Sequence, residues 1–541
     1  MKKILCSTLI LAMLLLLLPV AFAAEAAETS MIQITTNPAG ADVYIDGEFS
    51  GSVSPCSLLL DPGEHEISCR IPGYQTFSSV IQAEKGQKHE LTGKLLPDLP
   101  DAVVITVNTE EDLRHDDMSV FDRMTVETLP EKVSLRMAVA AVNNDPSDTA
   151  YRIEFADNVH HIVPEAEGGS IWVSRGNLVI NGDRDGDGAP DVTISEIPVG
   201  SLHILPVHDL YLNGLFFEGY SMAIRPDDNG TEDVLYENIY VLGCTFRMEL
   251  IAFGGACKSY NSSGATNYRN IYCCGCDLGD SNLFFSYSGN CDNSETDGLY
   301  YCANQLTDNG KLSVLTADCN TWYIYGRDSE NGNGGTPGAF ETSDDNVIRN
   351  VLISGNSGGG MVLGAGTNGN SRNILDQVTV RNNFFTDNLH IRPAQQFDDS
   401  NEGNTLSTSE NVISHLLITR NVIDGMARDY GPFFYTAIVA GIEHDPTSTF
   451  IAENNIIQDI SFVDNILIYI NGQDVWYTAG WLITPGVEYT LDDGIVISVI
   501  DIDGTDNATK QTDGNRYEGV LFSKNRKIDN YDPKLPWDQQ H

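Results

Sequence analysis

Four aspartates crowd into one short segment and are the residues best suited to hold a metal ion. Asp183, Asp185 and Asp187 alternate along the chain, Gly188 permits a sharp turn, and Asp191 follows closely. Alternate carboxylates around a glycine let a single loop surround a hard cation with oxygen ligands. We predict a structural calcium site at these four aspartates, with an acidic, solvent-exposed turn as the alternative.

Four tyrosines recur roughly 30 residues apart, at Tyr211, Tyr240, Tyr272 and Tyr300. Each stands between two apolar residues, so in a strand its side chain points to the opposite face, toward solvent. An exposed tyrosine row is a surface on which sugar rings can lie, with hydroxyls for hydrogen bonding. The alternative is a structural row that stabilises neighbouring strands or lies under long loops.

Pairs of adjacent acids are the candidates for catalysis: Asp344 with Asp345, Asp398 with Asp399, and Asp492 with Asp493. His390 and Arg392 would also face one side of a strand. A glycoside hydrolase needs two carboxylates at a set separation, and a lyase needs a base near a charge-neutralising cation. A chain with 76 acidic residues contains such pairs by chance, so we assign no catalytic residue.

The composition bounds the partners and the fold class. The 541 residues include 31 basic and 76 acidic ones, a formal net charge of −45. Because phosphate binding depends on basic surface, this excess speaks against nucleic acid as a partner. Hydrophobic residues at 41% indicate a folded, globular core.

The first 23 residues have the layout of a secretory signal peptide. Lys2 and Lys3 precede an apolar run over 9–18, and small residues follow Pro19. The run is too short to span a bilayer, and no later segment reaches the roughly 18 apolar residues that a span requires. We expect a secreted or cell-surface protein whose mature chain has no transmembrane segment.

Residues 31–97 alternate apolar and polar positions between glycine and proline breaks, which indicates short strands joined by hairpins. The short motifs PAGA, VYIDG, DPGEH and GY in this segment resemble those of the PEGA domain, with Ala39 in place of the glutamate in the family's name. The resemblance implies a small extracellular β-sandwich that serves as a binding or spacer module. We predict a disulfide between Cys56 and Cys69. Residues 98–132 follow as a linker and lead-in strand.

The rest of the chain repeats one eight-residue motif with apolar residues at its first, third and eighth positions. The copies start roughly 30 residues apart, except for one interval of about 50 that we interpret as two periods with an unreadable turn around 322–325. Too little chain lies between copies for crossover helices, so each strand must stack on its own copy. The copies span 210–217, 239–246, 271–278, 299–306, 351–358, 378–385, 416–423 and 450–457.

The sixth position of the motif is asparagine in the later copies, at Asn304, Asn356, Asn383, Asn421 and Asn455. An inward asparagine row satisfies main-chain groups at a solenoid corner, and parallel crossovers are right-handed. We predict an all-β protein: the β-sandwich, a right-handed parallel β-helix of the pectin-lyase type over 133–470, and terminal strands with a C-terminal tail over 471–541.

The repeat register also brings cysteines together. It places Cys244 over Cys276 and Cys274 over Cys302, and a rung spacing of about 4.8 Å suits a disulfide. We predict both disulfides. The alternatives are reduced thiols packed in the core and zinc ligands, which the absence of an accompanying histidine disfavours.

Residues 133–144 have helical spacing inside an otherwise β region, so we expect a short amphipathic helix that caps the open end of the β-helix. The letters SLR at 134–136 and Ala138 resemble the CSLREA motif at the start of adhesin-like surface β-helices. Met137 stands where that motif has glutamate, and Val133 where it has cysteine. The resemblance implies a surface or secreted β-helix.

Together these features predict an exported, cell-surface or envelope-associated protein that takes part in adhesion or binds a polysaccharide or cell-envelope glycan without catalysis. One alternative is a polysaccharide lyase or glycoside hydrolase acting in a groove along the β-helix, and another is a purely structural spacer. Against an enzyme of this kind, the chain lacks the Asn-Thr-Asp, Gly-His-Gly and Arg-Ile-Lys motifs of the polygalacturonases.

Overall fold

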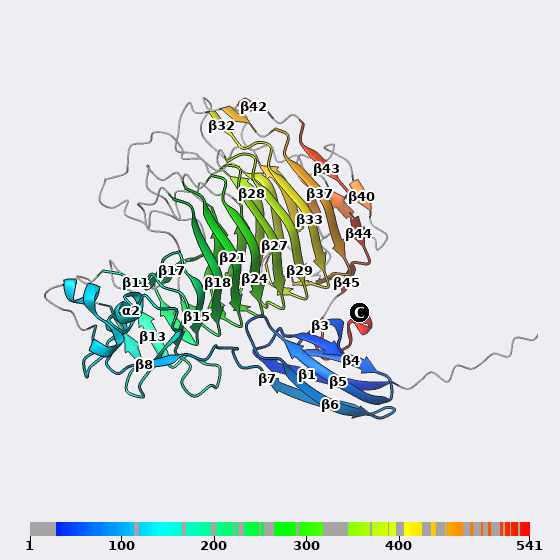
Figure 1. Cartoon of the computed structure of the whole chain (residues 1–541). Coiled ribbons are helices and arrows are strands. Elements are labelled where there is room, and N and C mark those ends of the chain that lie inside the picture. Colours follow the sequence, from blue (N-terminus) through cyan, green and yellow to red (C-terminus); the bar gives the residue numbers. More distant parts are fainter. Residues whose placement is uncertain are drawn as a thin grey trace, which may run out of the picture.

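The computed structural model consists of two parts, a small β-sandwich and a long stack of parallel strands, and the two parts pack against each other (Figure 1). The predicted signal peptide over 1–23 lies outside the described residues. The structure describes residues 29–540 except 113–117, 165–168, 196–201, 220–221, 225–231, 248–249, 254–263, 288–291, 317–343, 368–369, 388, 396–404, 425–433, 440–448, 452, 469–476, 480–487, 491–495, 499–508, 512–513, 520 and 529–530.

The N-terminal strands, blue in Figure 1, form the β-sandwich. One sheet has the strand order β4-β1-β7 and the other has the order β3-β2-β5-β6. Ile32, Ile34, Val43 and Ile67 are fully buried, because apolar and polar residues alternate and the pleat turns the apolar set inward. The strands are β1 (Ser30–Asn37), β2 (Asp42–Ile45), β3 (Glu48–Val53), β4 (Cys56–Leu60), β5 (Gly63–Arg70), β6 (Phe77–Ala83) and β7 (Lys88–Lys94).

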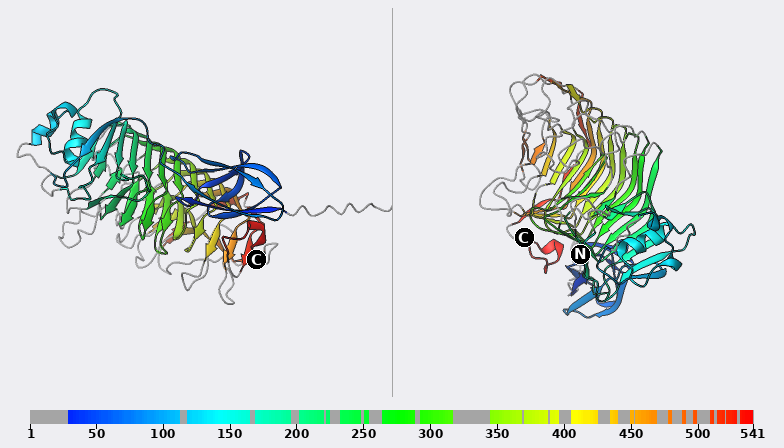
Figure 2. Two further views of the ribbon diagram at one scale, coloured as in Figure 1. Left: turned by 90° about the horizontal axis from the view of Figure 1, so that it is seen from below. Right: turned by 90° about the vertical axis from the view of Figure 1, so that its left-hand side faces the viewer.

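The remaining strands wind into a parallel β-helix, whose turns Figure 2 shows stacked along one axis. Most turns add one strand to each of three parallel sheets. Apolar side chains from all three sheets, such as Leu210, Phe217 and Leu283, fill the interior and are fully buried. Stacked copies bury a continuous core that a single turn could not form. The predicted fold class is therefore confirmed.

The largest of the three sheets, called here the long sheet, has 13 strands and carries the surface of interest below. Its strands are β8 (Val103–Val107), β9 (Tyr151–Phe155), β12 (Leu178–Asn181), β15 (His208–Asn213), β18 (Val234–Leu242), β21 (Thr266–Cys274), β24 (Glu295–Cys302), β27 (Val347–Ser354), β29 (Ile374–Arg381), β33 (Val412–Thr419), β37 (Ile456–Val463), β43 (Arg516–Glu518) and β44 (Leu521–Ser523).

The other sheets complete each turn. The 12-stranded sheet contains β11 (Ile171–Val173), β14 (Leu202–Ile204), β17 (Met222–Ile224), β20 (Leu250–Phe253), β23 (Asn282–Ser286), β26 (Lys311–Leu315), β28 (Gly360–Thr367), β31 (Leu389–Gln395), β35 (Phe434–Val439), β39 (Tyr477–Ala479), β40 (Glu488–Thr490) and β41 (Val496–Ser498). The shorter sheets contain β10 (His161–Ile162), β13 (Val192–Ser195), β16 (Leu215–Glu218), β19 (Thr245–Arg247), β22 (Asp277–Gly279) and β25 (Gln305–Leu306); β30 (Phe384–Phe385), β34 (Val422–Asp424), β38 (Ile466–Ile468) and β45 (Arg526–Ile528); and β32 (Thr405–Ser407), β36 (Thr449–Ile451) and β42 (Thr509–Gln511).

The predicted repeat register holds over most of the long sheet. Leu210 lies opposite Ile239, Ile239 opposite Ile271, and Ile271 opposite Leu299. The prediction for the long interval was wrong, because Leu299 in β24 lies directly opposite Val351 in β27. The interval is one turn with a long insertion, since register constrains the strands and leaves the length of a connecting loop free.

The last predicted copy, 450–457, was also wrong in register. Leu416 lies opposite Ile460, so the copy in the long sheet starts ten residues later. The cause is a second asparagine row, which mimics the first at the other end of the strands. Main-chain N–H groups donate to the asparagine side chain of the next turn in both rows. The first row is Asn304, Asn356, Asn383, Asn421, Asn465 and Asn525; the second is Asn346, Asn373, Asn411, Asn455 and Asn515.

The predicted capping helix is confirmed as α2 (Leu135–Asn143). The Ser134 side chain accepts a hydrogen bond from the Met137 main-chain N–H at 3.3 Å, which satisfies one free donor at the helix N-terminus. Arg136 is buried and pairs with buried Asp112 at 2.6 Å. The remaining helical turns are η1 (Met118–Arg123), η2 (Val126–Thr128) and η6 (Trp537–Gln539).

The β-sandwich packs on the side of the β-helix, at the corner where strands of the long sheet end. The Tyr74 hydroxyl donates to the Cys274 carbonyl at 3.2 Å, and the Arg381 guanidinium donates to both carboxylate oxygens of Asp42 at 2.9 and 2.7 Å. A Cβ atom on Gly40 would lie 2.3 Å from the Gly355 carbonyl oxygen, so this approach requires glycine.

Candidate functional site

The outer face of the long sheet is the candidate site, because two rows of side chains run along it from turn to turn. One is the predicted tyrosine row. The other, called here the bulge row, comes from one residue with a positive φ angle inside each of the eight long-sheet strands from β15 to β37. Asparagine and aspartate tolerate this left-handed conformation better than most residues. The bulge row is Asp209, Asn238, Asn270, Gly298, Asn350, Gln377, His415 and Asp459.

The four tyrosines form one continuous stack. Ring centroids lie 4.4 Å apart between Tyr211 and Tyr240, 4.5 Å between Tyr240 and Tyr272, and 4.4 Å between Tyr272 and Tyr300. The ring planes are tilted by 10° or less. Each inner ring therefore has both faces covered by its neighbours and presents only its edge outward.

The β-sandwich covers part of this stack. All four tyrosines are half-buried and pack against the apolar cluster that contains Tyr74 and Leu95 of the first domain. Burial raises the pKa of Tyr211 to about 12. The structural alternative for the row thus has a physical basis, and the predicted ligand role stays a prediction.

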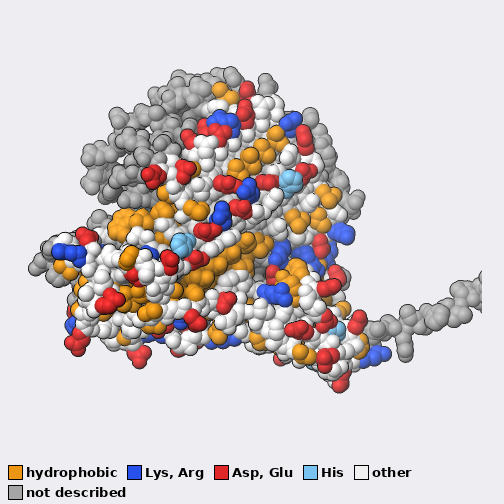
Figure 3. Space-filling view, viewed as in Figure 1, with side chains coloured by type: hydrophobic (Ala, Val, Ile, Leu, Met, Phe, Trp, Pro, Cys, Tyr) orange, Lys and Arg blue, Asp and Glu red, His pale blue; other side chains and the backbone are white. Residues whose placement is uncertain are grey.

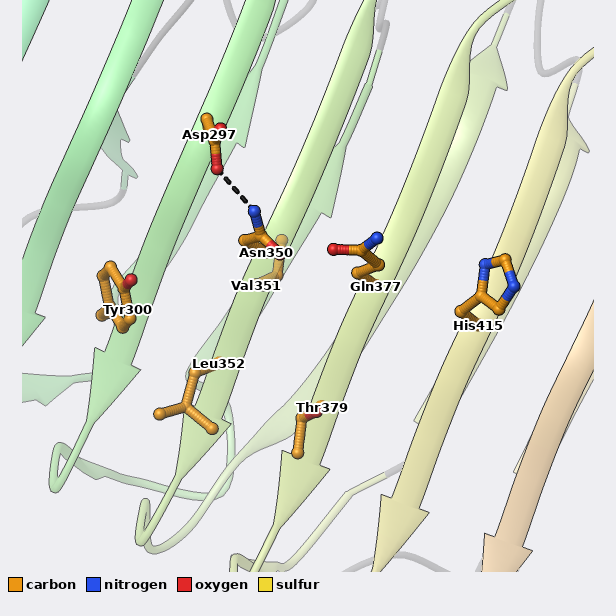
Figure 4. A pocket seen from close by; sticks show the side chains of 8 residues that line it. All are labelled: Asp297, Tyr300, Asn350, Val351, Leu352, Gln377, Thr379 and His415. Carbon is orange, nitrogen blue, oxygen red and sulfur yellow. Dashed lines mark hydrogen bonds between the residues drawn. The ribbon is translucent and has the colours of Figure 1, made fainter.

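A hollow of about 490 Å³ opens where the tyrosine stack ends (Figure 4). Leu352 and then Thr379 replace tyrosine on the next two turns, and the smaller side chains leave room beside the last ring. Sequence reasoning missed the bulge-row residues here, although a polar residue directly precedes the first place of these copies. The lining residues are Asp297, Tyr300, Asn350, Val351, Leu352, Gln377, Thr379 and His415.

The carboxylate in the hollow is held by its neighbours. The Asn350 side-chain amide donates to Asp297 at 2.6 Å, and the Arg349 Nε–H donates to the other carboxylate oxygen at 3.2 Å. The Asn350 hydrogen bond, together with Arg349, lowers the pKa of Asp297 despite partial burial. Asp297 is therefore an ionised, partnered acceptor rather than a proton donor.

His415 lies at the far side of the hollow and pairs with carboxylates on the neighbouring turns. Its Nδ1 lies 2.7 Å from Asp376, and its Nε2 lies 3.7 Å from Asp459. The hydrogen bond with Asp376 raises the pKa of His415. Burial alone would raise the pKa of Asp376, but hydrogen bonds from Ser414 and His415 outweigh it and lower that pKa.

These groups suit the binding of a polyhydroxylated ligand. A ring face and an aliphatic side chain offer apolar contact, while amide, hydroxyl and imidazole groups offer hydrogen bonds. Figure 3 shows a band of hydrophobic side chains on this face of the molecule, running beside a line of acidic and basic side chains.

None of the described acid pairs lies in the hollow. Asp344 and Asp345 both pair with Arg372, at 3.2 and 2.7 Å. His390 lies in β31 of the 12-stranded sheet, as does Arg392, whose side chain is outside the described residues. The pairs Asp398 with Asp399 and Asp492 with Asp493 also lie outside them.

The aspartate loop brings three of its four predicted ligands together. Carboxylate oxygens of Asp183, Asp185 and Asp187 all lie within 4.8 Å of one another. Asp191 instead accepts from the Arg184 main-chain N–H at 2.8 Å. Burial raises the pKa of Asp183, the neighbouring carboxylates add to this, and main-chain amides oppose it. The crowded negative charge is what a bound cation would relieve.

The described cysteines are free thiols in the structure. Cys274 lies opposite Cys302 on adjacent strands, as the register predicts. Cys244 and Cys276 lie on adjacent turns close enough for their thiols to interact. Burial raises the pKa of Cys69 to about 11. The three disulfides, including Cys56 with Cys69, stay predictions.

Comparison with known proteins identifies the first domain. The PEGA domain family model matches residues 29–98, and PEGA domains are typical of extracellular proteins. No curated protein and no solved structure was found to match the chain. Among the described residues, no helix has the length and apolar character needed to cross a membrane.

Proposed function

We propose that the protein is exported, remains secreted or at the cell surface, and binds a glycan without turnover in the hollow beside Tyr300. The observation that carries this proposal is the end of the tyrosine stack: the last ring meets a hollow lined by amide, hydroxyl and imidazole groups. The PEGA domain supports the extracellular location, as does the resemblance of 133–138 to the CSLREA motif.

The stack assigns different roles to its members. A sugar ring packs on an aromatic ring through its face, and the inner rings have both faces covered. Tyr300 is the ring that adjoins the hollow. We therefore infer that Tyr300 contacts the ligand, while Tyr240 and Tyr272 support the docking of the β-sandwich. Tyr211, at the far end of the stack from the hollow, packs against the same apolar cluster.

Two single substitutions separate these roles. Tyr300→Ala should weaken retention of the mature chain on its glycan by roughly fivefold, since an aromatic contact contributes about 1 kcal/mol beyond the area it buries. Tyr272→Ala should lower the melting temperature and leave the affinity within about twofold of the original. The measurement is affinity electrophoresis on plant, microbial and host polysaccharides, with a thermal melt of each variant.

The same incubations should be assayed for new reducing or unsaturated sugar ends. Retention without new ends is the expected result, because Asp297 is fully partnered and its pKa is lowered, which does not suit a general acid. Release of new ends would contradict binding without catalysis. Equal loss of binding in both tyrosine variants would contradict the special role of Tyr300.

We also propose that Asp183, Asp185 and Asp187 bind a structural calcium ion. The loop adjoins the first domain, because the Lys94 ammonium donates to the Gly186 carbonyl. A cation there would stiffen the loop that meets the β-sandwich. In an oxidising compartment, the pairs Cys244 with Cys276 and Cys274 with Cys302 would form disulfides across adjacent turns.

A further inference from the structure

The charged side chains around the hollow already have oppositely charged partners. Asp297 and Glu295 both pair with Arg349, and Arg269 pairs with Glu237 one turn earlier on the same face. A ligand in the hollow therefore meets an acid whose oxygens already have donors. Because two carboxylates share the one guanidinium of Arg349, the charge left over at this end is negative and offers no attraction to a uronate.

The other end of the hollow follows the same rule. His415 lies between Asp376 and Asp459, so when it is protonated its one positive charge is outweighed by carboxylates on both neighbouring turns. It cannot act as an uncompensated cation toward a uronate. The overall charge of −45 also repels a polyanion at long range.

Two uncharged polar side chains of the hollow lie on one strand. Gln377 and Thr379, both on β29, line the hollow (Figure 4). No described residue forms a hydrogen bond with the Gln377 side-chain amide or the Thr379 hydroxyl. A side-chain amide offers a donor and an acceptor together, which matches a pair of neighbouring sugar hydroxyls.

We propose that the hollow selects an uncharged hexopyranose, whose apolar side packs against Tyr300 and Leu352 and whose hydroxyls bind Gln377 and Thr379. This inference rests on the proposed glycan-binding function and names its ligand class. Selection against a uronate follows because it would lose hydration beside surplus carboxylate charge, whereas a protonated amino sugar would be held only by an attraction that salt screens, since these carboxylates already have partners.

The test compares three probes: neutral hexose oligosaccharides (a glucan, mannan and galactan set), oligogalacturonate and chitosan oligosaccharides. Binding to the mature chain is measured by calorimetry at low and high salt. We expect neutral oligosaccharides to bind with an affinity that changes less than twofold with salt. Any binding of chitosan should fall steeply with salt, as expected for general attraction to an acidic surface.

Two variants and one control tie the selectivity to the hollow. Gln377→Gly removes the amide at a position whose φ of 53° suits glycine, and Thr379→Val removes the hydroxyl while keeping the branched shape. Each should weaken neutral-oligosaccharide binding by roughly tenfold, the value of one or two lost hydrogen bonds. The control is Gln458→Ala on β37, two strands away, which should change nothing.

The outcomes distinguish the two levels of the argument. If none of the three probes binds, the proposed glycan-binding function itself fails. If oligogalacturonate or chitosan binds with little salt dependence, loses affinity in Gln377→Gly and outcompetes the neutral set, glycan binding stands and the uncharged ligand class is wrong. Melting temperatures within a few degrees of the original chain confirm that the variants are folded.

Discussion

The asparagine row at Asn383 allows the sharpest test of how this solenoid is held together. Asn383 is 1% exposed and accepts hydrogen bonds from the Asn356 main-chain N–H and side-chain amide, both at 2.9 Å. It donates to the Ile353 carbonyl at 3.0 Å and to the Asn421 side chain at 2.8 Å. Asn383→Ala removes these four bonds in a region closed to solvent.

The cost follows from which partners are left unsatisfied. Asn421 Oδ1 keeps the Asn383 main-chain N–H at 3.0 Å, and the Asn356 amide keeps the Tyr301 carbonyl at 2.8 Å. The Asn356 main-chain N–H loses its acceptor, which costs about 1–3 kcal/mol for a buried donor. With the remaining lost bonds, we expect Asn383→Ala to lower the free energy of unfolding by about 2–4 kcal/mol.

The assay is urea unfolding of the mature chain, followed by intrinsic fluorescence, with amide hydrogen exchange at Asn356 as the local readout. Gln458→Ala again serves as the control, because it deletes a side-chain amide from the outer face of the same sheet and should change stability by about 0.5 kcal/mol or less. A loss below about 1 kcal/mol in Asn383→Ala, or unchanged exchange at Asn356, would refute the reasoning.

Two further predictions concern the contacts between the parts of the molecule. Calcium should raise the melting temperature, and Asp185→Asn should abolish that effect. Because the pKa of Asp183 is raised, protons should displace the cation at a higher pH than they would at an ordinary aspartate. In a series of melts, the stabilisation by calcium should therefore fade on acidification. An unchanged melt in chelator would contradict the site. Asp42→Asn should leave the half-buried Arg381 without its counterion and lower the free energy of unfolding by about 2 kcal/mol. It should also speed proteolysis of the linker at 98–101. An unchanged cleavage rate would show that other contacts hold the β-sandwich in place.

The fold could be predicted from short-range pattern because a solenoid repeats its contacts. Each copy of the motif lies opposite the next copy, so the spacing of Leu210, Ile239 and Ile271 already predicts the strand register that the structure shows. The capping helix followed for a similar reason, since Ser134 and the apolar spacing after it are local signals.

The errors in the repeat share a physical cause. Loop length is unconstrained by strand register, so the insertion between Leu299 and Val351 looked like a missing turn. Asparagine caps both ends of the long-sheet strands, so Asn455 resembled a member of the first row while belonging to the second. One-dimensional spacing does not distinguish two corners that have the same chemistry.

The sequence by itself determined the two-part, all-β architecture, the acidic surface, the aspartate loop and the tyrosine row, because each depends on residue types at local or periodic spacing. Only the tertiary structure decided that the β-sandwich packs over the tyrosines, that their faces stack on one another, and that a hollow follows Tyr300. It also decided that Asp297 and His415 form ion pairs with neighbours on adjacent turns. These facts depend on contacts between residues far apart in the chain, where ring orientation, domain docking and charge pairing are set by packing in three dimensions.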